Sequence, residues 1–333
     1  MSQPPLLVHS APFLKGAATT PSIMRDVVAA SLVVTLSAFA VFGLSALLVV
    51  GATTLGAVLT EYVLGGRRRG SLRDWSALLT GILLGLTLPP GIPLWMALLG
   101  GAAAIGLGKA VWGGLGQNLF NPALVGRAFL QAAFPTAITT WSAQGQPALA
   151  LRASNFAWPL MAAPEVDAIT TATPLGLMKF DHEATPLVSL LVGDTAGSLG
   201  ETSALLLVVC GAWLVVRRAF DWRIPVGIVA TVGALSAVVH LAAPASFPTP
   251  WFMCLSGGLL FGAVFMATDP VSSPMSPRGT WVFAAGIGVL VVLIRLWGGL
   301  PEGVMYAILL MNAATPLLNR ALPTRPFGRG GRR

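Results

Sequence analysis

Residues 23–64 read IMRDVVAASLVVTLSAFAVFGLSALLVVGATTLGAVLTEYVL, a nearly continuous apolar stretch that is broken at Gly43 and Gly51. A bilayer core of ~30 Å takes about 20 helical residues, so this stretch has room for two membrane spans. We place these spans at roughly 24–43 and 46–64. The stretch therefore predicts a membrane protein.

The composition of the whole chain agrees with this prediction. Of its 333 residues, 55% are apolar and 10% are charged, and the mean hydropathy is +0.79. Soluble domains carry about 25% charged residues. The net charge of +8 lies in short loops between apolar runs, a pattern that reflects membrane topology and requires no nucleic acid as a partner.

Eight further apolar runs follow the first two. They lie at about 75–88, 93–112, 121–134, 203–216, 224–243, 250–267, 280–298 and 302–318. We therefore predict an all-α, polytopic integral membrane protein with about ten transmembrane helices in two five-helix repeats. Ser76–Leu79 and Ser203–Leu206 begin comparable spans with the same four residues, and an Asn121-Pro122 break faces an Asp269-Pro270 break. Repeats with broken helices are typical of transporter folds.

The basic residues predict the orientation. With ten spans both termini lie on one side, together with 16 of the 20 lysines and arginines, and that side is cytoplasmic by the positive-inside rule. Residues 1–22 are polar and proline-broken, so no cleavable signal peptide is expected. The predicted organisation is a cytoplasmic segment (1–22), a first repeat (23–134), an outward-facing loop (135–198), a second repeat (199–318) and a basic cytoplasmic tail (319–333).

The two cysteines, Cys210 and Cys254, each fall inside an apolar run, and no CxxC spacing occurs. Thiols at these positions are expected to pack in the bundle. We predict no metal site.

The outward-facing loop contains a hydroxyl-rich segment, DAITTATPL at residues 167–175. The hydroxyl of Thr173 is able to carry a phosphodiester, and Pro174 favours an extended conformation for Thr173. Ordinary turn chemistry is the plainer interpretation of Thr-Pro in a loop. From the residues alone, both interpretations stay open.

A second polar segment, GGLGQNLFNPAL at residues 113–124, lies between two predicted spans. Its glycines permit close approach of the backbone, and the amides of Asn118 and Asn121 offer hydrogen-bond donors and acceptors. Such a site suits a planar, hydrogen-bonding ring system. A helix break closed by asparagine side chains explains the same residues equally well.

Together with MATDPVS at 266–272 and GGLPEG at 298–303, these two segments resemble the D subunit of the Rnf electron-transport complex and the homologous B subunit of the sodium-pumping NADH:quinone reductase. The resemblance extends over nearly the whole chain. The family's flavin-attachment pattern, Asp-x-x-Ser/Thr-x-Ala-Thr, is matched by Asp167, Thr170, Ala172 and Thr173. Thr171 departs from the glycine common in the family and places a second hydroxyl beside the acceptor.

The resemblance implies two cofactors. FMN would be linked covalently to Thr173 through a phosphodiester, attached by a separate flavin transferase. A non-covalent riboflavin would lie in this subunit or at its edge, with Asn118 and Asn121 as candidate contacts.

The implied function is that of a membrane subunit of an ion-translocating ferredoxin:NAD⁺ oxidoreductase in the bacterial inner membrane. Its partners would be the other Rnf subunits and lipid, and it would not be a stand-alone catalyst, so no catalytic residue is assigned. The alternatives are a solute channel or transporter of two five-helix repeats without a redox cofactor, and a structural scaffold.

Three acids are candidates for an ion path, namely Glu61, Asp74 and Asp269, because a charged acid at membrane depth is costly without a partner or a function. Helix capping is the alternative for acids near span ends. Arg127 and Arg295 fall inside predicted spans, where they could pair with these acids, and Arg127 could instead contact a flavin phosphate.

Overall fold

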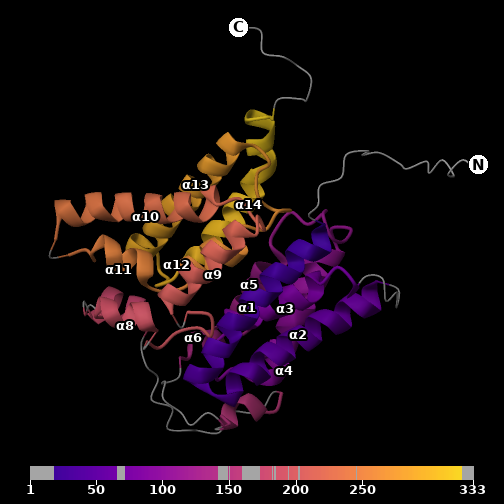
Figure 1. The fold of residues 1–333 in the computed structure, drawn as a ribbon. Helices are drawn as coiled ribbons and strands as arrows, with labels where there is room; N and C mark the ends of the chain where they lie inside the picture. Colours follow the sequence, from indigo (N-terminus) through magenta and orange to yellow (C-terminus); the bar gives the residue numbers. More distant parts are fainter. Residues whose placement is uncertain are drawn as a thin grey trace, which may run out of the picture.

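The computed structural model describes residues 19–65, 72–141, 149, 151–159, 173–181, 183, 185–193, 195–201, 203–244 and 246–324. Asp167, Thr170 and Ala172 of the attachment pattern lie outside this part of the chain. The described residues form helices joined by turns and include no strand, which confirms the predicted all-α fold (Figure 1).

The first half contains helices at the positions of the five predicted spans, each within a few residues of its expected bounds. They are α1 (Thr20–Phe42), α2 (Leu44–Leu64), α3 (Ser76–Leu86), α4 (Leu94–Ile105), which continues as the π-helical turn η2 (Gly106–Ala110), and α5 (Pro122–Ala133). Gly43 separates α1 from α2 with φ 74°, a left-handed value that glycine adopts without strain. Pro89 and Pro90 follow the end of α3 and prevent it from continuing.

Short elements connect the halves. They are α6 (Pro135–Thr139), η3 (Ala153–Phe156), α7 (Pro174–Gly176), η4 (Leu177–Asp181) and α8 (Leu187–Val192).

The second half contains α9 (Ala204–Val216), α10 (Arg223–Ala242), α13 (Pro277–Trp297) and α14 (Val304–Ala321). The span predicted at 250–267 is broken into α11 (Pro250–Leu255), α12 (Leu259–Phe261) and η5 (Gly262–Met266). The break lies at Gly257, where φ is 64°. Residues 259–267 are buried throughout, so the broken helix lies inside protein rather than against lipid.

Within the part of the chain that the structure describes, four helices are long and apolar enough to cross a membrane, namely α1, α2, α10 and α13. Shorter apolar helices are α3, α4 with η2, and α9. Many large apolar side chains on the long helices are exposed, among them Leu36 at 64% and Leu241 at 79%. Such faces are expected where the surrounding solvent is lipid.

The packing supports a repeat. α2 packs against α3 and α4, and α10 packs in the same way against α11 and α13; α4 then packs on α5 as α13 packs on α14. Figure 1 shows the two groups side by side, α1–α5 in indigo to magenta and α9–α14 in orange to yellow. Residues 78–89 (LLTGILLGLTLP) and 259–270 (LLFGAVFMATDP) share two leucines, a glycine, a threonine and a proline in register.

This register corrects one detail of the predicted repeat. The shared residues of Ser76–Leu79 and Ser203–Leu206 predict from the sequence that α3 and α9 are equivalent helices. The packing instead pairs α3 with the α11–η5 segment. Four-residue matches are common in apolar sequence, and this one does not reflect equivalent positions.

Glycines allow α2 and α4 to touch. A Cβ on Gly101 would collide with the carbonyl oxygen of Thr53, and a Cβ on Gly56 would collide with that of Leu98. Small residues at helix contacts are the usual solution in membranes, where close packing replaces the hydrophobic effect between helices.

We therefore expect Gly101→Ala to lower the thermal midpoint of the detergent-solubilised protein, by an amount that corresponds to ~1–3 kcal/mol of overpacking. Gly51→Ala is the matched control, because a Cβ there would meet no atom within 4 Å. Equal midpoints for the two variants would contradict this account of the α2–α4 contact.

Candidate functional site

Thr173 lies at the N-terminal end of α7, directly before Pro174. Its backbone is extended, with φ −70° and ψ 156°, as Pro174 predicted. Its Oγ1 accepts a hydrogen bond from the Gly176 N–H at 3.2 Å. Thr173 as a whole is partly exposed.

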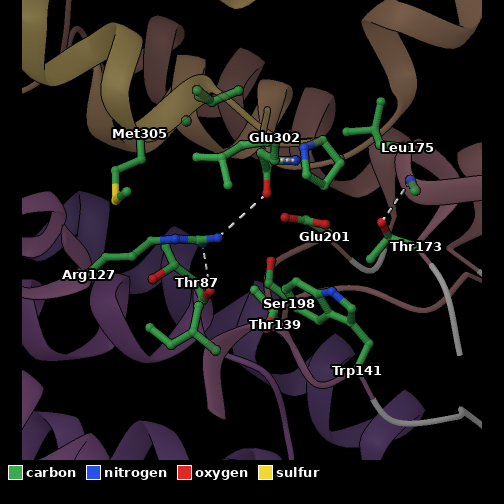
Figure 2. A pocket seen from close by; sticks show the side chains of 18 of the residues that line it. Thr87, Arg127, Thr139, Trp141, Thr173, Leu175, Ser198, Glu201, Glu302 and Met305 are labelled. Carbon is green, nitrogen blue, oxygen red and sulfur yellow. Dashed lines mark hydrogen bonds and ion pairs between the residues drawn. The ribbon is translucent and has the colours of Figure 1, made fainter. Parts of the chain in front are cut away.

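Thr173 lines a cavity of about 390 Å³, which we call the Thr173 cavity. Its wall combines Arg127 and Leu124 of α5, the 198–201 turn, the break at Gly257 and Gly258, and the 300–306 segment. Aromatic side chains contribute as well, namely Trp141, Phe180, Phe261 and Tyr306. Figure 2 shows Thr173, Ser198, Glu201 and Trp141 around one space. A cavity of this size and lining is typical of small-molecule sites.

Arg127 and Glu302 form an ion pair across this cavity. Arg127 Nη2 lies 3.5 Å from Glu302 Oε2, and Arg127 Nη1 donates to the Thr87 carbonyl at 2.6 Å. Glu302 Oε1 accepts the Gly258 N–H at 2.5 Å. From the sequence, Arg127 was expected to pair with Glu61, Asp74 or Asp269 or to meet a phosphate; its acid partner in the structure is Glu302.

Arg295 lies nearby in α13 and is 3% exposed. Its guanidinium donates to the carbonyls of Met253 at 2.7 Å and Ser256 at 3.0 Å. These carbonyls lie just before the break at Gly257, so Arg295 replaces the helical partners that the break removes.

Glu201 was missed from the sequence. It follows the glycine-rich turn 197–200, where Leu199 and Gly200 donate their N–H groups to the carbonyls of Leu88 and Leu86. These bonds fix Glu201 beside the end of α3, in the connection that precedes α9. The sequence signal for Glu201 as a site residue is a single acid that directly follows closely spaced glycines.

The environment of Glu201 is unusual for a carboxylate. Its Oε1 is shielded from solvent and has no hydrogen-bond partner among the described residues. Burial, and next the negative charge of Glu302, raise the pKa of Glu201 to about 7, whereas Ser198 and Arg127 act in the opposite direction.

Lys179 anchors residues 173–181, which we call the Thr173 segment, to the second half of the bundle through hydrogen bonds. Its Nζ donates to the carbonyls of Arg295, Gly298 and Leu300, at the end of α13 and just beyond it. A helix end leaves such carbonyls without helical partners, and a lysine is well suited to them. Burial lowers the pKa of Lys179.

The second cavity contains the predicted asparagines. It measures about 70 Å³ and is lined by Asn118, Asn121, Asp269, Lys109 and residues of α1, α3 and η5. We call it the Asn118 cavity. The structure thus brings together three residues that the sequence singled out, and places Thr173 in a separate cavity.

The two asparagines have different roles. Asn121 caps α5, accepting from the N–H groups of Ala123 and Leu124, and donates to the Met266 carbonyl at 3.0 Å. This is the helix break closed by an asparagine that the sequence left open. Asn118 donates to the Phe120 carbonyl, but its Oδ1 is buried without a partner among the described residues. Asn118 therefore retains an acceptor for a ligand.

Two of the three candidate ion-path acids share one cation. Lys109 Nζ lies 2.9 Å from Glu61 Oε2, 2.7 Å from Ser76 Oγ and 4.0 Å from Asp74 Oδ2. Asp74 also accepts from the N–H and the Oγ of Ser76 at the start of α3. Asp269 accepts from the Val271 N–H and Ser272 Oγ in the turn after η5.

These features define a class: an all-α polytopic membrane protein with two cavities on either side of a layer in which helices break. Comparison with known proteins gives the family. The model of the NQR2, RnfD, RnfE family matches residues 7–328, and the chain belongs to this family.

The sequence similarity to relatives named as D subunits covers most of the chain. Identity is 42% to the D subunit of the proton-translocating ferredoxin:NAD(+) oxidoreductase complex of Clostridium ljungdahlii, over 86% of this chain and 85% of that protein. It is 42% to the D subunit of the ion-translocating oxidoreductase complex of Stutzerimonas stutzeri, over 93% and 92%. It is 37% to the D subunit of the Na(+)-translocating ferredoxin:NAD(+) oxidoreductase complex of Acetobacterium woodii, over 98% and 97%.

The Lys109–Glu61 pair predicts a coupled stability effect. Lys109→Met leaves a buried carboxylate without its cation and is expected to cost ~3–5 kcal/mol, seen as a lower thermal midpoint. Adding Glu61→Met to Lys109→Met should restore much of that loss, because both charges are then gone. Purely additive losses in this double-mutant cycle would show that the pair is not a stabilising unit.

Proposed function

We propose that the chain is a membrane subunit of an ion-translocating ferredoxin:NAD⁺ oxidoreductase complex of the Rnf type, and that it carries FMN through a phosphodiester on Thr173. Membership of the family and the relatives named as D subunits support the first part. The observation that carries the second is the position of Thr173, extended and partly exposed on the wall of a cavity of about 390 Å³.

The cavity residues fit a flavin. Trp141, Phe180 and Tyr306 offer aromatic faces to a planar ring, and the glycine pair 257–258 admits close approach of a ring edge to the backbone. Lys179 and Leu175 hold the Thr173 segment against the cavity, Leu175 by packing at Gly257. A bound flavin supplies one- and two-electron transfer; the chain supplies position and local electrostatics.

Attachment requires a second enzyme. A flavin transferase would join the FMN phosphorus of FAD to Thr173 Oγ and break the pyrophosphate bond, with AMP as the leaving group. The hydroxyl of Thr173 suits this step, because Oγ1 accepts one hydrogen bond and donates to no acceptor among the described residues. Asp167 of the attachment pattern would be read by the transferase.

We further propose that riboflavin binds at the edge of the Asn118 cavity. The orphan Oδ1 of Asn118 supports a contact with a ring N–H. A space of about 70 Å³ does not enclose a three-ring system, so a neighbouring subunit or a side-chain shift must complete the site.

Thr173→Ala is expected to abolish the covalent flavin, because it removes the acceptor oxygen, whereas Thr171→Ala, which changes a variable position of the attachment pattern, should retain it. The measurement is intact mass and in-gel flavin fluorescence of acid-precipitated protein; flavin in the supernatant reports the dissociable riboflavin. Fluorescence retained in Thr173→Ala but lost in Thr171→Ala would move the attachment site by two residues. A wild-type chain without added flavin mass would favour the transporter alternative.

We also propose that both termini are cytoplasmic and that the Thr173 segment faces outward across the bacterial inner membrane. The positive-inside distribution supports this orientation. In intact cells a cysteine at the exposed position Thr140 should react with a membrane-impermeant maleimide, and one at the exposed position Thr324 should not. The reverse labelling pattern would invert the topology.

A further inference from the structure

One carboxylate oxygen of Glu201 is buried without a hydrogen-bond partner among the described residues, and the proposed function does not explain it. A buried polar atom normally has a hydrogen-bond partner, and leaving one unsatisfied is costly. Oε1 of Glu201 has no such partner among the described residues, although it lines the cavity beside Thr173. A proton on this carboxyl group would remove the charge and turn the acceptor into a donor.

The carboxylate of Glu302 faces the same glycine, Gly258, as the carboxylate of Glu201. A Cβ built on Gly258 would lie 2.6 Å from Glu302 Oε1 and 3.1 Å from Glu201 Oε1, so the two oxygens face one glycine. Figure 2 shows both carboxylates directed into the cavity, with Glu201 between Glu302 and Thr173. Two like charges this close disfavour one another's ionised form.

The partners of the two acids decide which one remains charged. Glu302 accepts a hydrogen bond at Oε1 from the Gly258 N–H and forms an ion pair at Oε2 with Arg127. Glu201 lacks an equivalent donor at Oε1 among the residues that the structure describes. Donors favour the ionised form of a carboxylate, so the proton belongs on Glu201.

The charges around the two glutamates come from three helices. Arg127 of α5 and Arg295 of α13 are the cations that act on the pair, and Asp181 of η4 lines the cavity at an exposed position. With both glutamates ionised, they balance Arg127 and the nearby Arg295, and Asp181 adds a negative charge at its exposed position. An anionic group on Thr173 would then leave an excess negative charge in the cavity, and protonation of Glu201 would cancel it.

We propose that Glu201 is a proton-binding residue of the Thr173 cavity, protonated while an anionic group linked to Thr173 occupies the cavity and Glu302 stays ionised. The proton site follows from the geometry of the two glutamates; its dependence on an anionic group rests on the proposed function. A proton needs one available oxygen, whereas a hard metal cation needs about six oxygen ligands.

The test is a pH titration of the purified complex by infrared spectroscopy, following the C=O stretch of protonated carboxylic acids between pH 5 and 9. We expect a band that titrates near neutral pH in the wild type and is lost in Glu201→Gln. Glu183→Gln, which changes an exposed acid in the same connection, is the matched control and should retain the band. A band unchanged in Glu201→Gln overturns the proposal.

Two further variants test the charge coupling. Removing a negative neighbour makes ionisation easier, so Glu302→Gln and Thr173→Ala should each move the titration midpoint to lower pH, by ~1 unit. An unmoved midpoint in both overturns the coupling to Glu302 and to the anionic group. The mass of the wild-type chain reports flavin attachment separately, and Glu302→Gln keeps the test available should Glu201→Gln fail to assemble.

Discussion

The side chain of Asn121 joins the two halves of the protein at the layer where their helices break. It caps α5 of the first half and donates to the Met266 carbonyl at the end of η5 in the second half. A bilayer offers no water to backbone groups freed by a break, so they must be satisfied inside the protein. The layer is thin: Ala123 and Phe265 line the Asn118 cavity, while their chain neighbours Leu124 and Met266 line the Thr173 cavity.

Each half also places a buried cation near the end of its long central helix. Lys109 ends the α4–η2 helix and bonds Ser76 at the start of α3; Arg295 ends α13 and bonds Ser256 just before α12. In the register that aligns residues 78–89 with 259–270, each cation is bonded just before the aligned segment. This correspondence explains why both residues tolerate burial, and why arginine serves where two carbonyls converge, since its guanidinium has more donors in a fixed geometry.

The sequence predicted the spans well because the apolar runs are long and are separated by charged, proline- or glycine-rich turns. It also predicted the extended backbone of Thr173, because Pro174 acts on its direct neighbour. It did not predict the roles of Glu201 and Glu302. Their meaning depends on contacts between residues about 100 positions apart in the chain, and no local pattern encodes that distance. For the same reason Glu61 had no visible partner until the fold brought Lys109 to it.

The charge balance separates the two cavities chemically. In the Asn118 cavity the Lys109 ammonium is neutralised by Glu61 and, at longer range, Asp74, so the acceptor of Asn118 faces a space with no excess positive charge. In the wall of the Thr173 cavity Arg127 is balanced by Glu302, and Arg295 lies nearby and donates its hydrogen bonds to neutral carbonyls. If Glu201 carries its proposed proton, the cavity wall holds one negative charge fewer beside a group on Thr173. The Thr173 cavity then suits a flavin that bears a phosphodiester, and the Asn118 cavity suits one without phosphate, which is how the proposed FMN and riboflavin differ.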